Sequence, residues 1–179
     1  MRKKIVSAVL LVIFISGTLF SALPIGKVAS LITIADDDGG KMDGTAWSSS
    51  ELVGKVWVLV YADPDESDLN NAATEALKAR NYSPEYYGSV AVINMAATWK
   101  PNFAISMILK GKQKKYPNTV YVKDINKMLV KKWNLADDSN DICVFGPDGK
   151  VLFSHDGQLS SSDINDMIKI VDEEVEKLK

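Results

Sequence analysis

A chain of 179 residues has the length of one domain, and its 46% hydrophobic content supplies enough apolar side chains for one core. Its 23 acidic residues outnumber its 21 basic ones, which excludes a general nucleic-acid binder because phosphate binding requires a dominant positive field. A single cysteine, Cys143, excludes an internal disulfide and any dithiol chemistry within the chain.

The first 22 residues have the layout of a secretory signal peptide. Met1–Lys4 is basic, Ile5–Ile15 is apolar except for Ser7, and Ser21-Ala22 offers small residues for cleavage. We therefore expect an exported protein that loses residues 1–22 and keeps residues 23–179 as one domain. Their removal takes away three basic residues and no acidic ones, which leaves a net charge of −5. The alternative is an uncleaved anchor, since the 19 residues Ile5–Leu23 come close to the ~20 that span a bilayer.

The remaining sequence alternates between strand and helix patterns. Apolar or alternating runs predict strands over residues 28–34, 56–62, 89–95, 118–122, 142–145 and 151–154. Helical spacing predicts helices over residues 69–80, 101–112, 125–133 and 164–178, the last one capped by Ser160–Asp163. Residues 36–40 predict a solvated hairpin loop, and residues 47–52 predict a capped helical turn. This order of elements indicates an α/β sandwich around a mixed sheet.

An acidic turn lies between the apolar strand 56–62 and the helix that follows it. The turn reads Asp63-Pro64-Asp65-Glu66-Ser67-Asp68, and Ser67 or Asp68 is expected to cap the helix. Its simplest interpretation is a helix-capping turn, because carboxylates interact favourably with the positive end of a helix. The same residues match the D-x-D-x-[ST] nucleophile loop of haloacid-dehalogenase-type phosphatases, with Lys132 and Asp137-Asp138 as formal partners.

Four other features are candidates for function. Cys143 lies in an apolar run, so we expect an inert core thiol rather than a reactive one. His155 is expected at the end of a strand, with no nucleophile recognisably placed beside it. The segment Lys110–Lys132 holds eight lysines and one acid, Asp124, which indicates a solvated face or a dock for an acidic partner or anionic lipid. Trp99 follows a strand, where a tryptophan either contacts a ligand or enters the core.

Three local signatures resemble the thioredoxin-like fold, in the branch with an N-terminal extension that includes peroxiredoxins and exported reductases. They are the residues 52–56 (LVGKV), the strand that ends at the Asp63 turn, and the hairpin sequence of residues 142–151 (ICVFGPDGKV). Within that fold the chain most closely resembles the YtfJ family of periplasmic proteins, on Trp47, Lys114-Lys115-Tyr116-Pro117 and the Asp156-Gly157 pair after the hairpin. The resemblance covers residues 25–178. It implies a three-layer sandwich with helices on both faces of a mixed central sheet, but no particular activity.

The resemblance also shows where this chain departs from redox-active members of the fold. Their two redox cysteines would fall at about Glu66 and Leu69, and the cis-proline that faces the cysteines would fall at about Asn140. The peroxiredoxin T-x-x-C pattern is also absent from the turn. Disulfide exchange requires an activated thiolate. The resemblance therefore implies the fold of these proteins but not their disulfide chemistry.

We therefore expect a periplasmic thioredoxin-like domain without dithiol redox chemistry, which serves as a binding or accessory module. The edge that binds a partner is expected to contain Asp63, Asp65, Glu66, Asp68, Trp99 and Asn140. Its acidic side chains favour a cationic ligand, a metal ion or a basic protein surface. The partner would be a periplasmic protein or a small ligand, and a membrane only if the signal segment stays uncleaved; we assign no cofactor, resident metal or catalytic residue. The alternative is an enzyme, either a thiol-dependent oxidoreductase that uses Cys143 or a metal-dependent hydrolase at Asp63 and Asp65.

Overall fold

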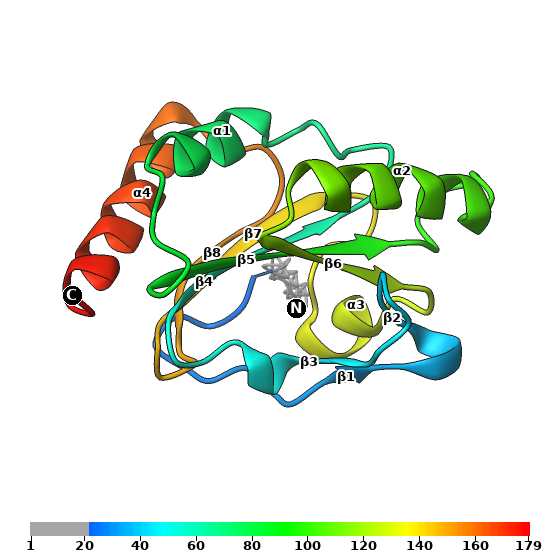
Figure 1. Ribbon diagram of the computed structural model, residues 1–179, viewed down its shortest axis with the longest axis horizontal. Coiled ribbons are helices and arrows are strands. Elements are labelled where there is room, and N and C mark those ends of the chain that lie inside the picture. Colours follow the sequence, from blue (N-terminus) through cyan, green and yellow to red (C-terminus); the bar gives the residue numbers. More distant parts are fainter. Residues whose placement is uncertain (1–21) are drawn as a thin grey trace, which may run out of the picture.

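The computed structural model describes residues 22–179, so the expected signal peptide lies almost entirely outside the described residues. Within this range, no helix combines the length and the apolar character that a membrane crossing requires. The main sheet has six strands in the order β2-β6-β5-β4-β7-β8 (Figure 1). Their bounds are Gly39–Lys41 (β2), Val56–Ala62 (β4), Tyr87–Asn94 (β5), Thr119–Asp124 (β6), Asn140–Phe145 (β7) and Val151–His155 (β8).

The sheet is mixed, and helices cover both of its faces. β4, β5 and β6 are parallel neighbours in chain order, whereas β2, β7 and β8 run antiparallel to their neighbours. The helices α1 (Asn71–Ala79) and α2 (Asn102–Lys115) connect the parallel strands, and right-handed crossovers in one direction place both helices on the same face. α4 (Ser161–Glu176) packs beside α1 on that face, and α3 (Met128–Trp133) lies on the other (Figure 1). This arrangement confirms the three-layer sandwich.

Strand β4 separates a hydrophobic core on the α3 face from a core on the other face, which consists of one cluster under α1 and α4 and one under α2. Its buried residues Val56 and Val58 pack with α1 and α4, whereas Leu59 and Tyr61 pack with α3 on the opposite face. Successive side chains of a strand point to opposite faces, so one apolar run serves both cores. The sequence therefore reads as continuously hydrophobic here because both faces of β4 are covered.

The N-terminal extension differs from the expected hairpin. Only Thr33–Ile34 of the expected strand 28–34 is a strand (β1), and it pairs with β3 (Trp47–Ser48) in a separate two-stranded sheet. The expected loop 36–40 is instead a 3₁₀ turn over Asp36–Asp38 followed by strand β2, at the edge of the main sheet. The reason is tertiary: Ile34 and Trp47 are buried against the α3 face, which brings Gly39 beside β6.

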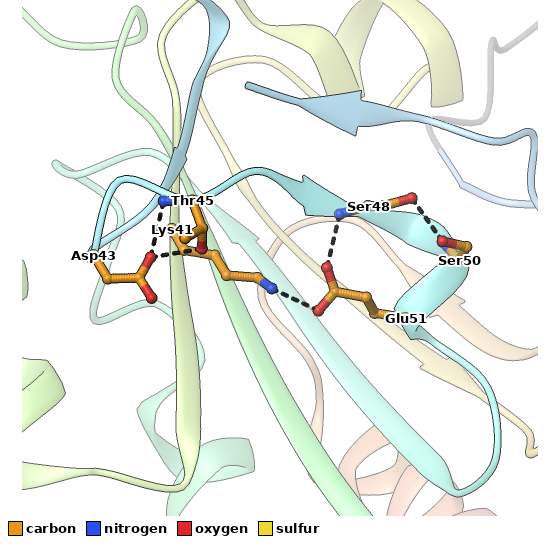
Figure 2. A network of polar contacts seen from close by, with 6 residues as sticks. All are labelled: Lys41, Asp43, Thr45, Ser48, Ser50 and Glu51. Carbon is orange, nitrogen blue, oxygen red and sulfur yellow. Dashed lines mark hydrogen bonds and ion pairs between the residues drawn. The ribbon is translucent and has the colours of Figure 1, made fainter. Parts of the chain in front are cut away.

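Polar contacts join the extension into one unit (Figure 2). The Ser48 amide donates to Glu51 Oε1 (3.0 Å), which confirms the capped turn expected over residues 47–52. Lys41 of β2 forms an ion pair with Glu51 (2.8 Å), and the Asp43 carboxylate accepts bonds from the Thr45 amide (2.9 Å) and hydroxyl (2.7 Å). These contacts connect the edge strand of the main sheet to the small sheet.

A substitution at Gly39 can test whether the pairing of β2 with β6 depends on the close approach of their backbones. Gly39 has φ of 121°, and a Cβ atom there would overlap the carbonyl oxygen of Lys123. We expect Gly39→Ala to lower the free energy of unfolding by about 2 kcal/mol. Gly111→Ala, on the exposed side of α2 where a Cβ meets nothing within 4 Å, should instead raise it by up to ~1 kcal/mol. Urea unfolding measures both changes, and a Gly39→Ala variant as stable as the parent would contradict the packing described here.

Candidate functional site

The turn after β4 is held by its own backbone and by the segment before β7. The Asp63 amide donates to the carbonyl oxygen of Ser139 (2.8 Å), and the Asp63 carboxylate accepts the Asp65 amide (2.7 Å). Asp63 is buried, and this burial raises the pKa of its carboxyl group, which the carboxylates of Asp65 and Asp138 raise further. Asp63 therefore shapes the turn rather than facing solvent.

Asp65 connects the turn to the segment that precedes α2. Its carboxylate forms an ion pair with Lys100 and accepts a hydrogen bond from the Thr98 hydroxyl (2.7 Å). The hydrogen bonds from Lys100 and Thr98 lower the pKa of Asp65. The Asp65 charge is therefore compensated inside the protein, whereas the exposed carboxylates of Glu66 and Asp68 have no ion pair within the described residues.

Asn70 and Asn140 hold the turn against two other loops. Asn140 donates to the Glu66 carbonyl oxygen (3.0 Å), and Asn70 Nδ2 lies within hydrogen-bonding distance of the Asn140 (3.1 Å) and Gly157 (2.9 Å) carbonyl oxygens. The Asn70 side-chain oxygen accepts the Leu159 amide (2.9 Å). Both asparagines are buried, so Asn140 is a structural clamp at the register position opposite Ala62.

The expectation that Ser67 or Asp68 caps α1 is wrong. α1 begins at Asn71, and the residue at the cap position is Asn70, whose side chain makes no capping bond because it is used by the other loops. Sequence reasoning missed Asn70. An asparagine before a helix predicts a cap, and nothing local shows that its partners lie 70 to 89 residues away.

The structure thus brings together the three segments expected to form the edge. The Asp63–Asp68 turn contacts Thr98 and Lys100 on one side and Ser139 and Asn140 on the other. Asp63 and Asn140 are buried, whereas Asp65, Glu66, Asp68 and Trp99 are exposed. Trp99 is 87% exposed, which decides between the two interpretations of this residue in favour of the surface.

An apolar stripe extends from Trp99 along α2. Phe103, Met107 and Ile108 are exposed, while Ile105 and Leu109 of the same helix are buried. Sequence reasoning did not single out the exposed residues. The sequence could have indicated these exposed residues, because apolar residues occur on more than one side of this helix. A helix at the protein surface needs only one apolar face. Large exposed apolar side chains that gather in one place typically mark an interaction surface.

Buried carboxyl groups occupy the α3 face of the sheet near the same edge. Asp124 accepts the Tyr61 hydroxyl (3.2 Å) and the amides of Met128 (2.8 Å) and Leu129 (3.0 Å), so it caps the start of α3, and burial raises the pKa of its carboxyl group. Asp141 is 1% exposed, and neither of its carboxyl oxygens has a hydrogen-bond partner among the described residues. Burial, with a smaller contribution from the nearby Asp156 charge, raises the pKa of Asp141 to about 8. Burial therefore favours the neutral form of Asp141 over its carboxylate.

The only cysteine is inaccessible. Cys143 lies in β7 with 0% exposure, opposite Leu59, and its sulfur lies 3.5 Å from the Ser154 hydroxyl. Burial raises the pKa of the Cys143 thiol to about 12, which the Ser154 hydrogen bond only partly offsets. His155 ends β8, as expected, and stacks on Phe153 at 6.3 Å.

The fold disperses the lysines of residues 110–132, whereas it keeps Asp138 close to the acidic turn. Four of these eight lysines lie on α2 and two on α3, at opposite faces of the sheet, while Lys123 lies in β6 and Lys127 precedes α3, so they do not form one basic face. Of the groups that a hydrolase would need, Asp65 is paired with Lys100 and Asp137 is paired with Lys127 (2.5 Å). Within residues 22–179, no three His, Cys, Asp or Glu side chains are placed to hold a metal ion.

Asp141 makes stability depend on pH. Its carboxyl pKa is about 8 in the folded chain and about 4 when unfolded, so the folded state holds the proton more tightly. The contribution of the Asp141 carboxyl group to the free energy of unfolding is therefore fully present below pH ~4 and is lost as the pH rises to about 8. Asp141→Asn should remove this dependence and raise the free energy of unfolding at pH 8 by about 2 kcal/mol or more.

Urea unfolding at pH 5 and pH 8 measures the effect as the difference between parent and variant. Asp166→Asn, at an exposed position of α4, is the matched control and should follow the parent at both values. Parallel pH profiles for the parent and Asp141→Asn would show that Asp141 is ionised in the folded protein.

Known proteins share this architecture. A putative thiol:disulfide interchange protein DsbE from Chlorobium tepidum superposes with a TM-score of 0.59 over 86% of this chain and 99% of that chain, at 14% sequence identity. At this identity the likeness shows the fold alone, which is thioredoxin-like.

Sequence relatives narrow the comparison to one family. An uncharacterized protein of Haemophilus influenzae (strain Rd) is 28% identical over 180 residues, with 96% of this chain and 97% of that protein covered. The protein YtfJ of Escherichia coli (strain K12) is 27% identical over 128 residues, or 70% of each chain. The family model described as "Bacterial protein of unknown function (YtfJ_HI0045)" matches residues 27–174, and the chain therefore belongs to this YtfJ family.

Proposed function

We propose that the protein is an exported thioredoxin-like domain without dithiol redox chemistry, which acts as a periplasmic binding or accessory module. The observation that carries this proposal is the state of its only thiol, because Cys143 is fully buried and its pKa is raised to about 12. The turn before α1, where thioredoxin-like enzymes present a cysteine, carries carboxylates in fixed contacts instead. Export is supported by the basic start of the chain and the short apolar run that follows it.

Binding is supported by what the edge exposes. Glu66 and Asp68 are exposed in the turn whose Asp65 contacts Thr98 and Lys100, the two neighbours of Trp99 in the chain. The apolar stripe of Phe103 and Met107 continues from Trp99 along α2. An apolar centre flanked by charges that lack ion pairs is the composition of a protein interaction site. The occupant that fits is a segment of a periplasmic protein with apolar side chains and at least one basic side chain, which would contact the Glu66 and Asp68 carboxylates.

The thiol provides the first test. We expect the native mature protein to react with a thiol reagent at least about 100-fold more slowly than the urea-unfolded protein, because the thiolate is both buried and disfavoured. The reaction is followed at pH 8 by the absorbance of the released chromophore. Peroxide or disulfide turnover that disappears in a folded Cys143→Ser variant would instead establish the thiol-dependent oxidoreductase.

The surface provides the second test. A photo-crosslinking amino acid at Trp99 or Phe103 should capture a periplasmic protein in living cells, and the same amino acid at Lys131 on α3 should not. Glu66→Gln with Asp68→Asn should lower the yield of the adduct several-fold without changing the fold, because the partner loses its charge contacts.

The matched control removes charge from the basic end of α2, with Lys110→Gln and Lys114→Gln. If only this lysine pair lowers the crosslink, the acidic turn serves the fold alone and the assignment of the edge is wrong. Crosslinking at Lys131 in place of Trp99 would contradict the docking surface itself.

A further inference from the structure

A groove lies on the helical face of the sheet, between α1 and α2. Its volume is about 910 Å³, at the upper end of the ~300–1,000 Å³ typical of small-molecule sites. Parallel strands β4, β5 and β6 form the floor, and the two helices lie above the same face of these strands (Figure 1). The groove is separate from the stripe of Trp99, Phe103 and Met107, none of which lines it.

The floor offers apolar contact and few hydrogen bonds. Val58, Val60 and Ala91 line it, and the last two are only partly buried although β4 and β5 are interior strands. The backbone groups of these strands are paired with neighbours on both sides. The floor hydroxyls of Ser89 and Thr119 bond to each other (2.8 Å). A ligand that lies on this floor must therefore be largely apolar, since a peptide backbone would lose its hydrogen bonds to water without replacement.

The two ends of the groove differ in charge. Ser67, Asp68 and Asn71 line the end at the carboxyl termini of the parallel strands. Four lysines line the opposite end, and they are Lys55, Lys78, Lys112 and Lys115. The groove spans most of the seven-residue strand β4, a length of roughly 20 Å at about 3.3 Å per residue.

Three of the four lysines have no carboxylate partner within the described residues, and Lys112 and Lys115 also bond to no carbonyl oxygen there. Lys78 is paired with Glu75 (3.1 Å), and Lys55 donates to the Pro84 carbonyl oxygen (2.9 Å). Lys112 and Lys115 form no ion pair within the described residues, and Lys115 lies 5.1 Å from the centre of the Tyr116 ring. No acidic residue occurs between Glu85 and Asp124, so the α2 wall of the groove has a positive field.

We propose that this groove binds an amphiphilic anion, namely a free long-chain carboxylate. Its apolar chain lies along Val58, Val60 and Ala91, and its carboxylate pairs with Lys112 and Lys115. Asp68 at the other end repels the anion and so fixes the direction of the chain. This inference goes beyond the docking role of the edge, and neither depends on the other.

Calorimetry with the mature protein and dodecanoate, kept below its micelle concentration, tests the proposal. We expect saturable binding with one dodecanoate per chain. Dodecanol should bind about tenfold more weakly because it lacks the charge that the lysines pair with, and inorganic phosphate should not bind. No saturable binding of dodecanoate, or equal binding of phosphate, would overturn the proposal.

Variants then locate the ligand. Lys112→Gln with Lys115→Gln should weaken dodecanoate about tenfold and leave dodecanol unchanged. The matched control is Lys131→Gln with Lys132→Gln, which makes the same charge change on α3 at the opposite face and should bind like the parent. Ala91→Phe should fill the floor and abolish binding of both ligands, and Ser89→Leu provides a second blocking change if the first fails to fold. Loss of dodecanoate binding in the α3 control, with the α2 pair unaffected, would place the ligand elsewhere.

Discussion

Strand β4 is the constraint on which the rest of the structure depends. It is hydrogen-bonded to β5 on one side and to β7 on the other, and its side chains contribute to both hydrophobic cores. Burial on both faces fixes its register, since a slip of one residue would exchange the side chains of the two cores. The end of β4 in turn places Asp63, and Asp63 begins the turn that thioredoxin-like enzymes use for catalysis.

Internal contacts give that turn a structural role. Its carboxylates are not simply exposed at the end of a helix: Asp63 is buried, and Asp65 is paired with Lys100. Asn70, whose side chain does not cap α1, and Asn140, at about the position of the cis-proline of redox-active members, hold the turn to the loops before β7 and before α4. Polar contacts with several distant partners give the turn a defined shape, which a binding edge requires as much as an active site does. The turn contains no cysteine, and Cys143 belongs to the hydrophobic core on the α3 face.

Helix α2 gives the protein two distinct surfaces. Ile105 and Leu109 anchor it to the sheet, and its outward side exposes Phe103, Met107 and several lysines. Its other flank forms one wall of the groove, through Lys112 and Lys115. α1 lies beside α4, so a strip of the sheet floor between α1 and α2 remains only partly covered. The apolar residues on more than one side of α2 and the lysines toward its end would both have a role if each of the two surfaces binds a ligand or a partner.

The sequence by itself determined the features whose causes act within a few residues. The apolar run at residues 56–62 predicts a strand buried on both faces, and Ser48–Glu51 and Ser160–Asp163 are local capping patterns that the structure contains. The chain order of strands and helices, together with the signatures at residues 52–56 and 142–151, is enough to predict the thioredoxin-like fold.

Only the tertiary structure decided the roles of residues whose partners are distant in the chain. The segment that begins at Gly39 forms an edge strand because it pairs with β6, which lies about 85 residues further along the chain. The Asn70 side chain bonds to the Asn140 and Gly157 carbonyl oxygens instead of capping α1, and burial raises the pKa of Asp141. The exposure of Trp99 and the gap between α1 and α2 follow from the way whole helices pack on the sheet. Residue type and local spacing fix which side chains are available, but burial and long-range contact are properties of the packed chain, and they decide what each side chain does.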